Sequence, residues 1–173
     1  MSSTLLEKMR KVNKVLQTSG TQSVSFHDLS KILSEVLNAN VYILSRKGRI
    51  LGYSLGTSEE CEFLKNELLT EKKFPDEYNK SLLSYHETRS NLINKDKLCV
   101  IDNRERCDMG TNYSTIVPVN GSGERLGTMM LAKYNQEFTD EDLVLAEYGA
   151  TVVGLEILRS KHDEIEEEAR KKA

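Results

Sequence analysis

Residues 113–133, YSTIVPVNGSGERLGTMMLAK, decide the fold. Two runs rich in β-branched and apolar residues flank a turn at 120–123, NGSG, where glycine tolerates the positive φ that a tight hairpin turn needs. Residues 115–119 alternate between two faces with the period of a strand. Pro118 has no amide hydrogen to donate, which predicts an edge position or a bulge. We therefore predict a β-hairpin at the heart of an antiparallel sheet.

The remainder of the chain carries alternating helix and strand signals. Apolar residues at helical spacing predict a helix over 4–18 and another after an N-cap at Ser25. Two further helices are expected, one from about residue 57 and one with Pro75 in its first turn. Strands are predicted at 41–45 and 49–55 around a turn at 46–48, and at 97–101, while residues 85–97 and 102–112 are expected to be irregular.

The last segment predicts a long helix. Thr139 and Asp142 form a capped start, and the pattern continues to about residue 172, a length near ~50 Å that exceeds what the sheet can cover. Ala146, Ala150 and Gly154 form a stripe of small residues that permits close approach to the sheet or to a second copy. The order of elements predicts an α+β fold, with an antiparallel sheet and its helices on one side.

Composition restricts the class of protein. The chain has 173 residues, 38% hydrophobic and 29% charged, and its net charge of −3 gives no general attraction to nucleic acid or anionic membranes. No apolar run approaches the ~18 residues of a membrane span. The cysteines, Cys61, Cys99 and Cys107, have no CxxC spacing, which favours reduced thiols and a cytoplasmic protein. The histidines are scattered, so no metal site is expected.

Two segments are candidate binding sites, and each has a plainer interpretation. The apolar residues between Phe63 and Tyr78 could line a pocket for a small hydrophobic metabolite, or they could be core. The turn at 45–49, SRKGR, could bind phosphate groups, or it could be a solvated hairpin tip. No GxxxxGK[ST] motif is present, so a P-loop is excluded. No constellation of residues supports catalysis.

Longer motifs carry a resemblance to a known family. ERLGT at 124–128, DEDLVLAEYGATVVGLEILR at 140–159 and EIEEEARKKA at 164–173 closely resemble the CodY family, as do LSRKGRILGYSL at 44–55, FPDEY at 74–78 and STIVPV at 114–119. This family consists of transcription regulators of low-GC Gram-positive bacteria that respond to GTP and branched-chain amino acids. The resemblance implies a dimeric protein with a GAF-type effector-binding domain over 1–138 and a linker helix over 139–173. The family's winged helix-turn-helix domain, which binds DNA, would follow and is absent here.

The resemblance also implies two effector sites. A pocket for isoleucine, leucine or valine is implied at Tyr42, Ser45, Phe63, Leu64, Leu68, Phe74, Pro75, Tyr78, Cys99, Val100, Ile101, Asp102 and Asn103. The family's carboxylate-binding arginine would fall at Phe63 or Leu64, so either Lys65, after a change of helix register, or strand amides at 99–103 would hold the carboxylate instead. A GTP site is implied at Ser45, Arg46, Lys47, Arg49, Glu156 and Lys161.

The expected function is therefore a non-catalytic sensor in which a branched-chain amino acid and GTP act as effectors, without a metal. The full-length regulator would bind DNA as a homodimer, with no membrane contact. One alternative is a dimerisation module with a vestigial pocket. A less favoured alternative is a free methionine sulfoxide reductase, an enzyme of the GAF fold that uses cysteines; replacing Cys61, Cys99 and Cys107 would test it.

Overall fold

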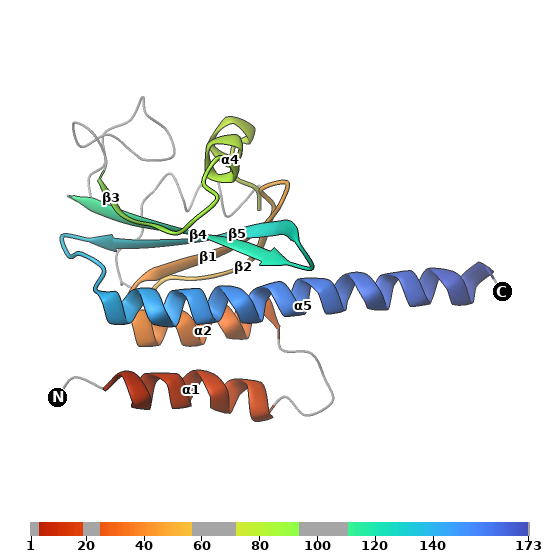
Figure 1. Cartoon of the computed structure of the whole chain (residues 1–173), viewed down its shortest axis with the longest axis horizontal. Coiled ribbons are helices and arrows are strands. Elements are labelled where there is room, and N and C mark those ends of the chain that lie inside the picture. The colour runs from red at the N-terminus through yellow and green to blue at the C-terminus, as the bar shows by residue number, and fades with distance from the viewer. Residues whose placement is uncertain (1–3, 19–24, 57–71, 94–110, 173) are drawn as a thin grey trace.

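The computed structural model describes residues 4–18, 25–56, 72–93 and 111–172. Its helices and strands follow the predicted order in the described ranges, except for one additional strand at residues 89–93 (Figure 1). The elements are α1 Leu5–Thr18, α2 Phe26–Leu37, β1 Asn40–Ser45, β2 Ile50–Ser54, α4 Asp76–Leu83, β3 Arg89–Ile93, β4 Asn112–Gly121, β5 Glu124–Tyr134 and α5 Asp140–Lys172.

The predicted hairpin is confirmed as the centre of the sheet. β4 and β5 pair antiparallel from Asn112↔Tyr134 to Gly121↔Glu124, and the five strands lie in the order β2-β1-β5-β4-β3. The turn is tighter than predicted, because Gly121 still belongs to β4. Ser122 and Gly123 make the turn with φ angles of 53° and 75°. Positive φ at both central residues matches the right-handed twist of the two strands.

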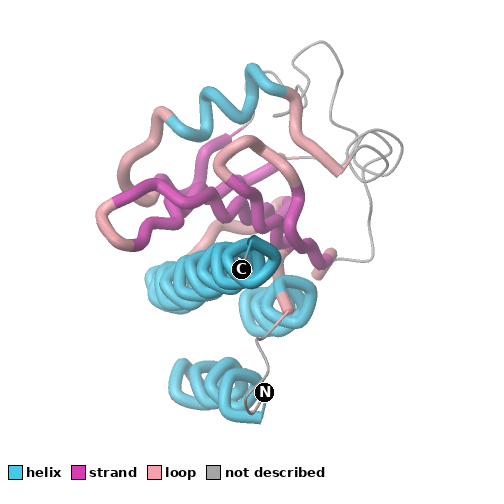
Figure 2. Tube along the Cα trace, turned by 90° about the vertical axis from the view of Figure 1, so that its right-hand side faces the viewer, coloured by secondary structure: helices cyan, strands magenta, loops and turns pink. Residues whose placement is uncertain are grey.

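The helices cover both faces of the sheet, which corrects the expectation that they lie on one side. α2 and α5 pack on one face with α1 outside them, and α4 lies on the other (Figures 1 and 2). The cause is visible in β1, whose residues are almost all buried. Val41 and Ile43 join the core under α2 and α5, whereas Tyr42 and Leu44 join a second core under α4. A strand apolar on both faces needs cover on both.

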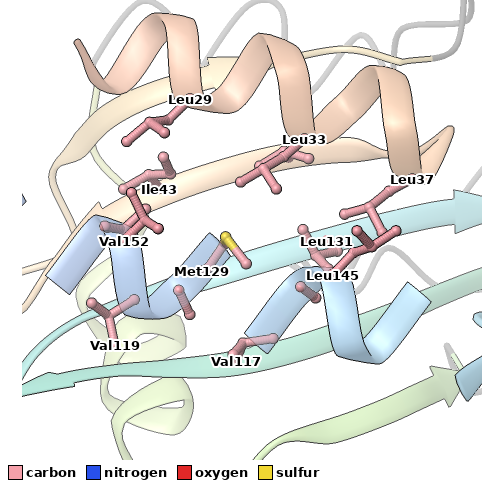
Figure 3. Close-up of a cluster of buried hydrophobic side chains, with 14 of the residues drawn as sticks. Leu29, Leu33, Leu37, Ile43, Val117, Val119, Met129, Leu131, Leu145 and Val152 are labelled. Carbon is pink, nitrogen blue, oxygen red and sulfur yellow. The ribbon is translucent and has the colours of Figure 1, made fainter. Parts of the chain in front are cut away.

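The larger core joins α2, α5 and the sheet. Leu29, Leu33 and Leu37 of α2 lie over Ile43 and Leu131 of the sheet (Figure 3). Burying a leucine side chain of this kind contributes roughly 1.5–3 kcal/mol. This layer fixes the position of α2, and α2 in turn brings its first residue, Phe26, beside the turn between β1 and β2.

The stripe of small residues in α5 packs on the chain's own sheet. Ala146 and Ala150 are buried, and a β carbon added at Gly154 would lie 2.8 Å from the backbone oxygen of Asn120 in β4. The helix start is capped as predicted: the Thr139 amide donates to Asp142 Oδ2, and the Asp142 amide donates to Thr139 Oγ1. The backbone of α5 continues as helix to Lys172, past the end of the sheet (Figure 1).

The prediction that residues 85–97 are irregular is wrong for β3. Arg89–Ile93 has weak strand propensity, but it pairs with β4 from Arg89↔Ile116 to Ile93↔Tyr113 with a bulge between. The ladder partners come from β4, 20 or more residues later, so no local pattern announces the strand. Pro118 lies in β4 past the Ile116 pairing with β3, in agreement with its predicted edge position.

α4 begins one residue later than expected. Pro75 is its N-cap, and the helix runs from Asp76 with Asp76 and Glu77 in its first turn, where carboxylates favour the positive end of the helix dipole. The helix predicted from about residue 57 and the strand predicted at 97–101 lie outside the described residues.

Candidate functional site

The basic turn, defined here as Ser45–Arg49, joins β1 to β2 and is held by its own backbone. The Gly48 amide donates to the Ser45 carbonyl at 2.9 Å, and the Ser45 amide donates to the Arg49 carbonyl at 2.8 Å. The Arg49 amide donates to Ser45 Oγ at 3.1 Å. Gly48 has φ 86°, in the left-handed region that favours glycine. The predicted turn is confirmed, and it leaves the side chains of Arg46, Lys47 and Arg49 exposed.

A cavity of about 370 Å³ opens beside the basic turn. Ser45, Arg46 and Lys47 line one side of it, and Ile157 and Ser160 of α5 line another. Its volume lies within the ~300–1,000 Å³ typical of small-molecule sites. The structure thus brings the basic turn close to residues 157–160 of α5, which lie between Glu156 and Lys161, the two helix residues implied for GTP.

The cavity combines cations with an apolar wall. The apolar side chains come from four elements: Phe26 of α2, Leu51 of β2, Leu126 of β5 and Ile157 of α5. Exposed cations beside such a wall suit an anionic ligand that also has a flat or apolar part. Sequence reasoning missed these apolar residues because each is an ordinary core residue of its own element, and no motif links them.

Three further residues are implied for the GTP site: Arg49, Glu156 and Lys161. Among the described residues, Arg49 and Glu156 do not line this cavity, although Arg49 belongs to the basic turn and Glu156 is next to Ile157 in α5. Lys161 lies on the helix backbone of α5, and its side chain is outside the described part.

Three of the residues implied for the amino-acid pocket, Tyr42, Phe74 and Tyr78, form an aromatic cluster under α4, on the face of the sheet opposite α5. The Phe74 ring is only 1% exposed and lies 5.8 Å from the Tyr42 ring, edge to face, and 5.8 Å from the Tyr78 ring, stacked. The Tyr78 hydroxyl donates to the sulfur of Met130 at 3.6 Å. The described part of this segment therefore packs as core, while Pro75 is exposed at the N-cap of α4.

Ser45, which is also implied for the amino-acid pocket, lies in the basic turn and lines the cavity beside α5. The described ranges do not include the remaining pocket residues or the cysteines of the reductase alternative, namely Phe63, Leu64, Leu68, Cys99, Val100, Ile101, Asp102, Asn103, Cys61 and Cys107.

A second cavity, of about 520 Å³, lies along the edge of β4 beyond the end of β3. Its lining includes His86, Glu87, Pro118, Glu147 and Thr151, and no residue predicted from the sequence for a site. In the described part of the chain, no group of three or more His, Cys, Asp or Glu residues is arranged to hold a metal ion. None of the described helices is both long and apolar enough to cross a membrane.

Comparison with known proteins agrees with this fold. The family model described as the CodY GAF-like domain matches residues 4–173. The global transcriptional regulator CodY of Clostridium kluyveri is 57% identical over 171 residues, which cover 99% of this chain and 66% of the relative. That of Clostridium tetani is 55% identical with the same coverage. The chain thus spans just under two thirds of the length of these relatives.

A solved structure extends the likeness to three dimensions. The cofactor-binding GAF domain of the nutrient sensor CodY from Clostridium difficile is 46% identical and superposes with a TM-score of 0.64, over 91% of this chain and 99% of that one. The predicted α+β class with a GAF-type sheet is therefore confirmed. The sequence match over nearly the whole length and the shared fold show that this chain belongs to the CodY family, through its GAF-like domain.

Proposed function

We propose that this chain is the effector-binding part of a CodY-type transcription regulator, with GTP bound beside the basic turn and a branched-chain amino acid bound near the aromatic cluster. One observation carries the proposal: the cavity in which Arg46 and Lys47 lie opposite residues of α5. A ligand in that cavity would contact both the basic turn and the long helix.

The chemistry of the cavity suits a nucleoside triphosphate. Arg46 and Lys47 are exposed and can form charge-assisted hydrogen bonds to phosphate oxygens. The Phe26, Leu51 and Ile157 side chains offer an apolar surface for a base or a ribose. Arg49 extends the positive charge of the turn for a long polyphosphate.

The aromatic cluster supports the amino-acid site by its apolar character. Tyr42, Phe74 and Tyr78 offer mainly aromatic ring surface, with two tyrosine hydroxyls as the polar groups, and ring surface matches an aliphatic side chain better than a polar one. Because no arginine stands at Phe63 or Leu64, we propose that the backbone amides of residues 99–103 take the ligand's carboxylate.

α5 is the element through which we propose that effectors act. Ile157 and Ser160 line the cavity, and the helix continues without a break to Lys172. A ligand that binds one arrangement of this helix more tightly shifts the population toward that arrangement. In the full-length regulator the helix would carry this shift to the DNA-binding part, and the regulator would act as a homodimer without catalysis.

The test is thermal unfolding of the 173-residue chain with GTP, isoleucine, leucine, valine or lysine. A ligand at ~100-fold its dissociation constant adds ~2.7 kcal/mol of stability, a shift of several degrees for a domain of this size. We expect shifts with GTP and with the branched-chain amino acids but not with lysine. Replacing Arg46 and Lys47 by alanine should remove the GTP shift alone, whereas the exposed Lys80→Ala in α4 should remove neither.

A GTP shift that survives the loss of Arg46 and Lys47 would place the nucleotide elsewhere. No shift with any of these ligands would contradict the sensor function, and a ligand-independent dimer in gel filtration would then favour the dimerisation module.

A further inference from the structure

Asn79 connects α4 to the basic turn. It lies in the second turn of α4, is only 6% exposed, and its Nδ2 donates to the carbonyl of Arg46 at 3.0 Å. The contact is close: a β carbon added at Gly48 would lie 2.9 Å from Asn79 Cγ. The side-chain amide of Asn79 therefore rests directly on the backbone that presents Arg46 and Lys47.

The burial of the Asn79 side chain has a cost in free energy that the hydrogen bond from its Nδ2 only partly offsets. Its Oδ1 is buried and accepts no hydrogen bond from any residue in the described part of the chain. An apolar side chain would fill the same space without that cost. What asparagine adds is the donor to the Arg46 carbonyl, which fixes the turn in one position.

A short ladder of backbone hydrogen bonds also joins residues 72–74, just before α4, to residues 48–50 at the end of the basic turn. The Ile50 amide donates to the Lys72 carbonyl, the Phe74 amide donates to the Gly48 carbonyl, both at 2.9 Å, and Arg49 and Lys73 form an isolated antiparallel bridge. Lys72 has φ 56°, a left-handed conformation that is uncommon for a lysine. Such a conformation persists where the surrounding contacts determine it.

Phe74 is the residue at which the ladder meets the aromatic cluster. Its amide donates a hydrogen bond to the Gly48 carbonyl of the basic turn, and its ring packs between Tyr42 and Tyr78. Asn79 follows Tyr78 directly in α4. A displacement of α4 that repacks these rings would therefore move the Asn79 side-chain amide and the Phe74 backbone. Both groups are hydrogen-bonded to the basic turn.

We propose that Asn79 is a positioning residue for the basic turn and couples the two effector sites, an inference that rests on the proposed function. A ligand that orders the aromatic cluster holds α4 in place, and α4 through Asn79 holds the cations where they meet phosphate. The two ligands then favour the same arrangement and raise each other's affinity by the same factor.

The test uses the 173-residue chain with Asn79→Ala, Asn79→Asp and the matched control Asn91→Ala. Like Asn79, Asn91 donates its Nδ2 to a backbone carbonyl, that of Phe138, at 3.0 Å, but it lies in the strand at the opposite edge of the sheet. Its Oδ1 also accepts the Phe138 amide at 2.7 Å, so Asn91→Ala removes at least as much hydrogen bonding as Asn79→Ala. Asn79→Asp keeps the size of the side chain and replaces the donor by a negatively charged acceptor, so it tests the hydrogen bond if Asn79→Ala does not fold.

The first measurement is amide hydrogen exchange by NMR and needs no ligand. In both Asn79 variants we expect the Gly48 and Arg49 amides to exchange roughly 2- to 10-fold faster than in the wild type, the factor that corresponds to one net hydrogen bond. The Met129 amide in the central strand should be unchanged. Asn91→Ala should leave Gly48 and Arg49 as they are. Unchanged exchange at Gly48 and Arg49 in both Asn79 variants would overturn the proposal.

The second measurement is the affinity for GTP with and without saturating isoleucine, by calorimetry. In the wild type we expect isoleucine to tighten GTP binding by about 5-fold or more. In the Asn79 variants GTP should bind more weakly and the factor should fall toward one, while Asn91→Ala keeps the wild-type factor. A factor equal to the wild-type value in the Asn79 variants would overturn the coupling. If the wild type binds neither ligand, the proposed function fails, and the exchange rates still decide whether Asn79 positions the turn.

Discussion

Lys133 Nζ and Asp142 Oδ2 lie 2.9 Å apart, and both side chains are almost fully buried, with exposed fractions of 6% and 7%. The same carboxylate oxygen accepts the Thr139 amide, and the ammonium lies 5.0 Å from the centre of the Phe138 ring. One ion pair thus fixes the end of β5 to the start of α5. The pair therefore holds the first turn of the long helix against the end of the sheet.

Removing one partner of this pair should destabilise the protein strongly. Asp142→Ala leaves the Lys133 ammonium buried without its carboxylate and removes the helix cap, so we expect a loss of about 3–5 kcal/mol in the free energy of unfolding. Urea denaturation followed by circular dichroism measures it. Asp140→Ala, an exposed change in the same helical turn, is the control. A loss below about 1 kcal/mol for Asp142→Ala would mean that solvent reaches the pair.

Arg125 should be necessary for anchoring α4. Its guanidinium donates to the carbonyls of Leu82, Tyr85 and Gly127 and to Thr128 Oγ1. Burial lowers the pKa of Arg125, but the guanidinium stays charged at neutral pH because the ordinary pKa of an arginine lies far above neutrality.

We therefore expect Arg125→Met to cost about 2–4 kcal/mol of stability, since several carbonyls lose a charged donor. Arg125→Lys should recover only part of it, because an ammonium cannot reproduce the planar fork. Chemical denaturation of both variants gives the two values. Equal stability of the lysine variant and the wild type would show that charge alone suffices.

Gly154 should tolerate no side chain. A β carbon there would meet the Asn120 backbone oxygen at 2.8 Å, and backbone cannot move aside cheaply. Gly154→Ala gains ~1 kcal/mol of helix propensity, yet we expect a net loss of about 1–3 kcal/mol from the forced separation of α5 and β4. The exposed Thr151→Ala, one turn earlier, should be near neutral. Thermal unfolding of the two variants decides, and a more stable Gly154→Ala would contradict the close packing.

Phe74 should link stability to amino-acid binding. Phe74→Leu keeps an apolar side chain but removes the ring contacts with Tyr42 and Tyr78, so we expect a loss of about 1–2 kcal/mol and weaker isoleucine binding. Tyr78→Phe removes only the hydroxyl that bonds the Met130 sulfur and should change both little. Calorimetric titration with isoleucine measures the affinities. Unchanged isoleucine affinity in Phe74→Leu would separate the aromatic cluster from the binding site.

Local chemistry in the sequence determined much of this protein. The β4–β5 hairpin follows from alternating apolar residues around a glycine-containing turn, and the start of α5 follows from the Thr139–Asp142 cap. The basic turn follows from Gly48, whose positive φ closes it. The cap and the two turns depend on residues a few positions apart, and the strands of the hairpin pair outward from its turn. Local chemistry therefore favours each of these features before distant elements pack on them.

Only the tertiary structure decided how distant residues meet. α4 covers the second face of the sheet, β3 exists because β4 supplies its ladder, and Phe26 and Ile157 line the same cavity beside the basic turn. Asn79 reaches the Arg46 carbonyl across 33 positions of sequence. The sequence around Asn79 and around Arg46 carries no local signal for this contact, because the packing of whole elements brings the two residues together. The motifs located the turn and the helix, and the fold supplied the cavity between them.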